Sequence, residues 1–328
     1  MSAAAAGPAL RAFLEGLIDY AGLFPPARLD LAPAVEEFVG HFGGSESWML
    51  GRFIVPAARF GDLLDRLPAP GAAGPFRLAV LAGGGATERE ALDRILAEAA
   101  ALDDLGRRHA GKVAILAIET RLPRETLEAE DAEHVRDYAD DFRAALAGSG
   151  LAGVPAFFEV APVARYPDAD RDAAVGLADA GEAGPSPRAG FKLRCGGPEP
   201  SDVPSAGRIA RVIAECRDRG VPLKCTAGLH QPLRAPAAAG RAERHGFLNV
   251  FVAAVLAFAR WIPLDEIEAC VLDTDASSFR FDDEGVTWRS RNVAAAEIER
   301  ARRLFATGFG SCSFDEPREG LRHLRFLS

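Results

Sequence analysis

The sequence of 328 residues lacks any long uninterrupted apolar segment. Its longest apolar stretch, Phe247–Ala259, is broken by Asn249 and falls short of the ~18 residues that suggest a membrane-spanning helix. Basic residues are also in the minority, with 38 against 47 acidic ones, which gives a net charge of −9. Nucleic acids and anionic membranes are bound by basic surfaces. The sequence therefore predicts neither a nucleic acid nor a membrane as a partner.

Paired cysteine motifs are absent as well. The five cysteines are odd in number and none belongs to a CxxC pair, so neither a disulfide framework nor a zinc site is expected. Residues 1–16 contain no basic leader followed by an apolar segment, and we expect no signal peptide. These features predict a cytoplasmic protein with reduced thiols, and they leave open whether it forms a homo-oligomer.

Lysine is scarce, and its placement is unusual. Only three lysines occur among the 38 basic residues, and two of them, Lys192 and Lys224, lie in the short apolar segments GFKLRCGG and PLKCTAGL. The pKa of a lysine shifts readily on burial, which suits a catalytic base or an amine that forms a Schiff base. These two segments therefore indicate a candidate active site of an enzyme.

Strand-like and helix-like segments alternate along most of the chain. Eight apolar segments are predicted as strands, each followed by a predicted helix. The eight segments are 49–56, 76–83, 112–120, 154–162, 190–197, 222–229, 269–275 and 306–314. Apolar strands alternating with amphipathic helices predict an α/β fold with a parallel sheet, and eight repeats predict a closed (β/α)8, or TIM, barrel. An open doubly wound sheet is the alternative, although no GxGxxG motif follows the first strand.

The N-terminal residues 1–47 precede the first predicted strand. Helices are predicted at 8–20 and 34–42, with the Pro25–Pro26 pair between them. We expect a short helical extension that caps the barrel bottom or reaches over its rim, followed by the barrel in residues 48–328. Asp19 and Tyr20 would contribute polar groups to a pocket only if this extension folds over the rim.

Polar residues gather at the predicted strand ends, where barrels of this type carry their active sites. Side chains alternate along a strand, so Lys192 and Arg194 share one face, as do Lys224 and Thr226. Adjacent strands lie about 4.8 Å apart, which would bring the two lysines close together. Each cation would then lower the pKa of the other, giving a neutral amine near pH 7. Structural ion pairs of the lysines with Glu119 or Glu159 are the alternative.

These positions predict distinct roles. We expect Lys224 to act as nucleophile or base, Lys192 to lower its pKa, and Glu119 or Glu159 to transfer protons. Arg194 would bind the anionic group of a substrate. Cys312 is expected to be a buried thiol, because no histidine lies near it in the pattern. The remaining strand-end residues expected to contact substrate are Gly196, Gly197, Thr226, His230, Asp273, Ser311 and Ser313.

The lysine segments have a local family resemblance. The segment from Lys224 to Gly228, KCTAG, resembles the K-x-[ST]-x-G strand around the Schiff-base lysine of deoxyribose-phosphate aldolase. The segment from Lys192 to Gly197, KLRCGG, is similar to the second-lysine strand of that family, K-x-S-G-G, although the two strands occur in the opposite order here. This resemblance is confined to the two segments. It implies class I aldolase chemistry, with Lys224 as nucleophile and Lys192 as the residue that tunes its pKa.

Together these features predict an enzyme that acts on a small anionic oxygenated metabolite by lysine-centred chemistry of the aldolase, lyase or isomerase type, without a required cofactor. One alternative is a lyase or isomerase that holds a divalent metal through Glu119, Glu159 and His230. The alternative outside enzymology is a non-catalytic barrel that binds an anion through Lys192 and Arg194.

Overall fold

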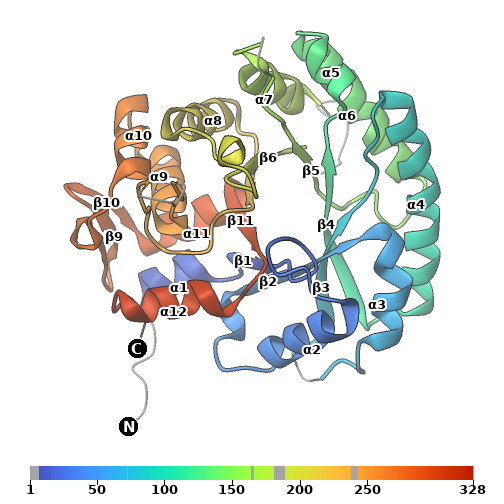
Figure 1. Ribbon diagram of the computed structural model, residues 1–328, viewed down its shortest axis with the longest axis horizontal. Coiled ribbons are helices and arrows are strands. Elements are labelled where there is room, and N and C mark those ends of the chain that lie inside the picture. Colours follow the sequence, from blue (N-terminus) through green and yellow to red (C-terminus); the bar gives the residue numbers. More distant parts are fainter. Residues whose placement is uncertain (1–6, 72, 164–165, 181–188, 238–242, 328) are drawn as a thin grey trace.

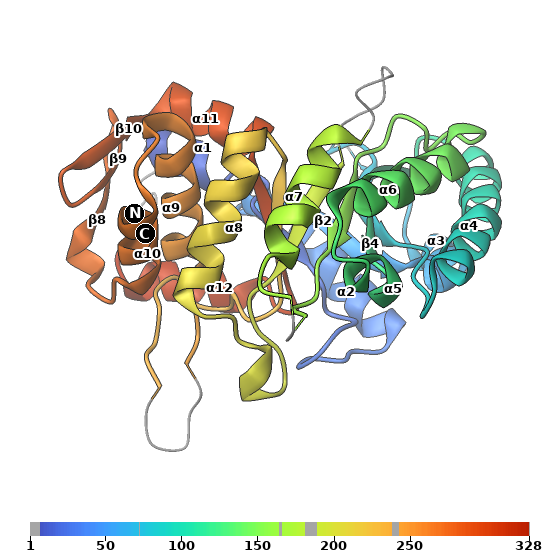
Figure 2. The ribbon, with the colours of Figure 1, turned by 90° about the horizontal axis from the view of Figure 1, so that it is seen from above.

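The computed structural model describes residues 7–71, 73–163, 166–180, 189–237 and 243–327. Residues 1–6, part of the segment in which no signal peptide is expected, lie outside this description. Eight parallel strands close into a barrel, and helices surround it (Figures 1 and 2). The predicted (β/α)8 barrel is therefore confirmed. Its strands, in order around the barrel, are β1 (Ile18–Tyr20), β2 (Leu50–Pro56), β3 (Phe76–Leu81), β4 (Val113–Arg121), β5 (Ala156–Glu159), β6 (Gly190–Arg194), β7 (Leu223–Thr226) and β11 (Ala306–Ser311).

Helices connect the strands and cover the outer face of the barrel (Figure 1). The helices are α1 (Pro8–Leu14), α2 (Leu31–Phe42), α3 (Phe60–Arg66), α4 (Glu88–Arg108), α5 (Arg124–Glu128), α6 (Ala132–Ala147), α7 (Ala169–Asp179), α8 (Ala206–Arg219), α9 (Phe247–Arg260), α10 (Leu264–Leu272), α11 (Ala295–Leu304) and α12 (Asp315–His323). Short 3-10 helices lie at Ser47–Met49, Ala57–Arg59, Pro200–Asp202 and Ala276–Ser278. A separate antiparallel sheet contains β8 (Phe279–Phe281), β9 (Gly285–Trp288) and β10 (Arg291–Ala294). In the described part of the chain, no helix is both long and apolar enough to cross a membrane.

Helix α8 illustrates how the sequence specifies these elements. The Ser205 side chain caps its start by accepting a hydrogen bond from the Arg208 N–H at 3.2 Å. Ile209 and Ile213, four residues apart, are buried on the face that packs on the barrel. Gly220 ends the helix in the left-handed conformation, with φ of 66°, which glycine adopts at little cost. Strand β7 can therefore begin three residues later.

One predicted strand is wrong. Residues 269–275 were predicted as the seventh strand, but they lie mostly in helix α10, which begins after Pro263 and buries Ile267, Cys270 and Val271 at helical spacing. A short apolar run fits a buried helix and a buried strand equally well, so its pattern does not distinguish them.

The missing barrel strand is β1, which pairs with both β2 and β11. It lies inside residues 1–47, predicted as an extension outside the barrel, and within 8–20, predicted as one helix. Helix α1 instead ends at Leu14, and Gly16 turns the chain with φ of 57°. The barrel therefore starts at Ile18, and the two lysine strands are the sixth and seventh in chain order.

Arg302 joins the N-terminal segment to the end of the barrel. It lies on α11 and is buried, and its guanidinium donates hydrogen bonds to the carbonyl oxygens of Phe13 at 2.9 Å, Glu15 at 3.1 Å and Ala306. Burial lowers the pKa of Arg302 to about 9. The side chain thus holds the end of α1 beside the start of β11, which positions β1 between β11 and β2.

We expect Arg302→Met to reduce the free energy of unfolding by about 3 kcal/mol, because three carbonyl groups lose a charged donor in a buried site. Urea denaturation measures this change. The control is Arg303→Met at the exposed neighbouring position, which we expect to change stability by less than about 0.5 kcal/mol. Equal losses in the two variants would show that Arg302 does not anchor this segment.

Candidate active site in the barrel interior

Lys192 and Lys224 occupy directly paired positions on the adjacent strands β6 and β7. Both are buried, at 3 % and 0 % exposure. Their chain neighbours Leu193 and Cys225 belong to the large core between strands and helices, so strand alternation turns both lysines into the barrel interior. This is the arrangement that the alternating pattern of the two segments predicts.

The two ammonium groups do not contact each other, because carboxylates lie between them. Lys224 forms an ion pair with Asp19 of β1, and its Nζ lies 2.8 Å from Glu119 Oε1 of β4. Lys192 Nζ lies 2.9 Å from Glu119 Oε2 and 3.1 Å from Glu159 Oε2 of β5. We call Asp19, Lys224, Glu119, Lys192 and Glu159 the interior network. Negative and positive side chains alternate along this network, which crosses the barrel interior.

Arginines contact both ends of the interior network. At one end, the backbone N–H of Arg52 donates to Asp19 Oδ1 at 2.6 Å, and its Nη1 lies 3.3 Å from Oδ2. At the other end, Arg121 Nη2 and Arg194 Nη1 lie 3.2 and 3.7 Å from Glu159 Oε1. Arg121, Glu159 and Arg194 are the last residues of their strands. The Arg121 side chain is 64 % exposed, so this end of the network reaches solvent at the carboxyl face of the barrel.

The pKa values follow from this alternation. Burial alone would raise the pKa of Glu119, but Lys192 and Lys224 outweigh burial and lower it to about 2. The pKa of Glu159 is also lowered, because Lys192 and Arg121 outweigh its burial. Burial would lower the pKa of Lys192, yet Glu119 and Glu159 raise it overall. At neutral pH, Lys192 is therefore an ammonium held between two carboxylates.

This result corrects the expected electrostatics. Direct repulsion between two lysines was predicted to give a neutral amine near pH 7, but the pKa of Lys192 is raised. The reason is the position of Glu119, which places a negative charge between the two cations. The ion pairs that the sequence offered as an alternative are present.

Positive charge exceeds negative charge in and around the network. Within the described residues, two lysines and three arginines contact three carboxylates, which are Asp19, Glu119 and Glu159. Part of this surplus lies at the carboxyl face of the barrel, which we call the mouth, where Arg121 and Arg194 share a single oxygen of Glu159. The two arginines and one carboxylate give this end of the network a net positive charge.

Part of the barrel interior is apolar. Ala21, Ile54, Ala79, Ala117 and Phe157 form a buried cluster separate from the main core. Bulky branched residues usually fill the interior of such barrels. Ala117 and Phe157 lie two residues before Glu119 and Glu159, so the apolar cluster and the interior network share strands β4 and β5.

Asp273, predicted to contact substrate, lies away from the barrel interior. Its Oδ2 accepts hydrogen bonds from Trp288 Nε1 at 3.0 Å and from Arg289 Nη2 at 3.1 Å, beside the small antiparallel sheet. The displacement follows from the wrong strand assignment of 269–275, because α10 carries this segment outside the barrel.

The glycines and serines at the strand ends serve local structure. A Cβ on Gly196 would lie 2.8 Å from Gly228 Cα, and one on Gly197 would lie 2.2 Å from Asp202 Oδ2. Both glycines therefore allow close packing within the protein itself. Ser311 Oγ accepts a hydrogen bond from the Ser313 N–H at 3.4 Å, and Ser313 Oγ accepts one from the Glu316 N–H at 3.1 Å. Thr226 ends β7 on the same face as Lys224.

His230 lies apart from the two carboxylates with which the metal alternative groups it. Its Nδ1 is 3.1 Å from Glu316 Oε2 and 3.9 Å from Cys312 Sγ. Among the described residues, no three histidine, cysteine or acidic side chains are arranged to hold a metal ion. Cys312 thus has a histidine neighbour, His230, which the sequence around Cys312 does not predict. Burial raises the pKa of the Cys312 thiol.

Sequence reasoning missed part of the site. Arg52 and Arg121 were not singled out, and Asp19 was considered only as a group reaching over the rim. Asp19 instead lies inside the barrel on β1, with no exposed surface. The signal available was an acidic residue inside the short apolar segment LIDYAGLF, just before the Pro25–Pro26 pair.

Comparison with known proteins adds no family assignment. A search of protein-family models finds none that matches this chain, and a search of curated proteins finds no match either. The function must therefore be inferred from the geometry of the site.

We expect Glu119→Gln to reduce the free energy of unfolding by about 3 kcal/mol at pH 7, because two buried ammonium groups lose their shared counter-ion. The folded-state pKa of Glu119 is about 2, against an ordinary value of 4.5. Its stabilising contribution is therefore complete above pH 4.5 and is lost as the pH falls toward 2. Urea denaturation across this range should show the difference between wild type and variant shrinking with falling pH.

Glu299→Gln, at an exposed position on α11, is the control and should show no such pH-dependent difference. A difference between wild type and Glu119→Gln that stays constant from pH 5 to pH 2 would contradict an ionised Glu119.

Proposed function

We propose that this barrel is an enzyme that carries out aldolase-like lyase or isomerase chemistry on a small anionic carbonyl compound at the carboxyl face of the barrel. Barrels of this fold carry their active sites at that face. The central observation is the Lys192 ammonium, held between Glu119 and Glu159 directly beneath the mouth arginines. It combines a proton donor, a carboxylate base and an anion-binding group in one place.

Arg194 and Arg121 would bind the anionic group of the substrate. A guanidinium has five N–H donors, and each of these two has a single ion-pair contact with Glu159. The remaining donors suit a carboxylate or a phosphate, which arginine binds with two parallel hydrogen bonds. The substrate carbonyl would then point down toward Lys192.

Lys192, rather than Lys224, would contact the substrate. The carboxylate partners of Lys224, Asp19 and Glu119, both have no exposed surface. Lys192 contacts Glu159, which in turn contacts the mouth arginines. In this proposal Lys224 keeps Glu119 ionised, and Glu119 positions Lys192. The roles are the reverse of those that the resemblance to deoxyribose-phosphate aldolase implies.

The chemistry follows from the charge states. The Lys192 ammonium would donate a hydrogen bond to the carbonyl oxygen, and the Glu159 carboxylate would accept a proton from the adjacent carbon or from a β-hydroxyl. The electrons of the broken C–H or C–C bond would move into an enolate, whose oxygen the ammonium stabilises. Glu159 would then return its proton to complete the reaction. These steps require no cofactor. The five free cysteines favour the reducing cytoplasm as the compartment of the protein.

A Schiff base is the covalent form of the same proposal. Lys192 would first transfer a proton to Glu159, and its neutral amine would add to the carbonyl carbon and expel water. The pKa of Lys192 is raised, so its neutral amine is scarce at neutral pH. The neutral amine becomes more abundant as the pH rises, and imine formation should therefore be faster in alkaline solution. The resemblance of the two lysine segments supports this form.

Proton exchange into substrate analogues in D2O tests the proposal. We expect the wild type to exchange the C3 protons of pyruvate or 2-oxobutanoate, or the carbon-bound protons of dihydroxyacetone phosphate, as followed by NMR. Lys192→Arg keeps the charge but misplaces the donor, and it should slow exchange at least about tenfold. Lys112→Arg is the matched control, because Lys112 contacts the Leu64 carbonyl outside the network. It should leave the rate unchanged.

Borohydride added during the same reaction separates the two forms. A reduced adduct on Lys192 would establish the Schiff base, whereas exchange without an adduct would establish the hydrogen-bonded form. An adduct on Lys224 would overturn the assignment of Lys192. Tight binding of these anions without exchange or adduct would instead show a non-catalytic anion-binding barrel.

A further inference from the structure

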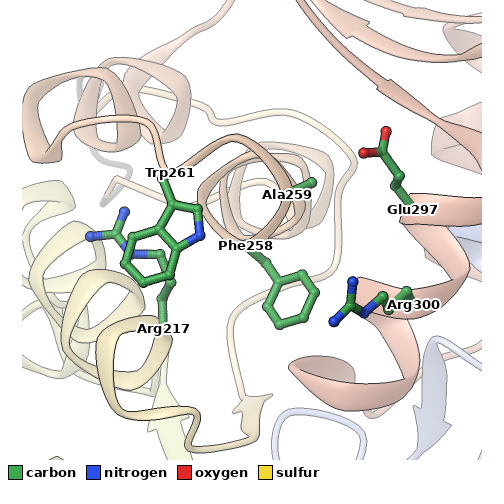
Figure 3. A pocket seen from close by; sticks show the side chains of 6 residues that line it. All are labelled: Arg217, Phe258, Ala259, Trp261, Glu297 and Arg300. Atoms are coloured by element: carbon green, nitrogen blue, oxygen red, sulfur yellow. The ribbon is translucent and has the colours of Figure 1, made fainter.

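A second candidate site lies outside the barrel, between α8, α9 and α11 (Figure 3). It is a cavity of about 350 Å³ lined by Arg217, Phe258, Ala259, Trp261, Glu297 and Arg300. Arg217 lies in the last turn of α8, and Trp261 directly follows α9. Because β7 starts just after α8, these helix ends lie at the end of the barrel opposite its mouth. A ligand in this cavity would therefore be distant from Lys192.

Trp261 presents an aromatic surface at this cavity. The residue is 63 % exposed, and the Arg217 guanidinium lies 4.9 Å from its ring centroid. Its φ of 50° is in the left-handed region, where a helix normally ends with glycine because a bulky residue is disfavoured there. Figure 3 shows Trp261 and Arg300 on opposite sides of the cavity with Phe258 between them. The cavity thus offers two aromatic rings and a guanidinium.

One cationic side chain at the cavity has no acidic partner among the described residues. Glu297 is bound by two nitrogens of Arg260 at 2.5 and 2.6 Å, and Arg217 is paired with Asp218 at 2.7 Å. Arg300 forms no ion pair with any residue that the structure describes, and its guanidinium lies 5.9 Å from the Phe258 ring. The free positive charge at this cavity therefore favours a negatively charged ligand.

We propose that this cavity binds a planar aromatic anion, with its ring against Trp261 and Phe258 and its anionic group at Arg300. The volume is at the lower end of the roughly 300–1,000 Å³ typical of small-molecule sites, which suits a ligand of one or two fused rings. Stacking on the indole would bury its exposed face, and the arginine would supply a charge-assisted hydrogen bond. The site is independent of the proposed reaction at the barrel mouth.

The test uses 2-naphthoate as the probe, with calorimetry or ligand-observed NMR at low salt. We expect 2-naphthoate to bind at least about fivefold more tightly than neutral 2-naphthamide and than non-aromatic cyclohexanecarboxylate. Arg300→Gln and Trp261→Leu should each weaken its binding at least about fivefold. Arg303→Gln removes the same charge from an exposed position on the same helix and should leave binding unchanged. Lys192→Arg, in the interior network, should also leave 2-naphthoate binding unchanged.

The proposal is overturned if 2-naphthoate shows no saturable binding, if 2-naphthamide binds equally well, or if Arg300→Gln binds like the wild type. Arg300 is exposed and forms no ion pair with a described residue, so its replacement preserves the fold and keeps the test decisive even if Trp261→Leu is unstable. Loss of binding in Lys192→Arg would place the probe at the barrel mouth and would equally overturn it.

Discussion

The carboxylate of Glu119 holds two buried ammonium groups at once, at 2.8 and 2.9 Å, and the barrel interior is organised around this shared contact. Burying an unpaired charge is strongly unfavourable, so each buried cation needs a carboxylate and each buried carboxylate needs a cation. The five members of the interior network come from five different strands. Their charges are therefore compensated only when the barrel is closed. The contact that makes the interior compatible with folding also fixes Lys192 beneath the mouth.

Local patterns predicted the lysine strands well and their surroundings poorly. The period of two along a strand placed Lys192 and Lys224 inside the barrel, because each alternation needs only adjacent residues. Asp19 lies 205 residues from its partner Lys224, and nothing in either segment specifies that contact. The pKa of Lys192 was mispredicted for the same reason. Its value depends on Glu119 and Glu159 arriving from β4 and β5, which only the closed barrel determines.

Two short elements account for the errors in the fold. Strand β1 has only three residues and follows a true helix, so its apolar residues continued the helical pattern of α1. The segment 269–275 is a compact apolar run in which helix and strand patterns coincide. One strand was missed and one was predicted wrongly, so the predicted number of eight barrel strands is still correct. Asp273 was misplaced with that segment, and Asp19 was not assigned to the barrel interior.

The charge state of Lys192 is the most direct test of this account, and the rarity of lysine makes it measurable. Selective isotope labelling of lysine gives three side-chain signals, and Lys192→Arg identifies the one that belongs to Lys192. The account predicts that the Lys192 ammonium persists to a pH above the ordinary lysine pKa of 10.5, because two carboxylates hold its proton. A Lys192 signal that titrates near pH 7 would contradict it, because the amine would then be neutral and Glu119 would not compensate its charge.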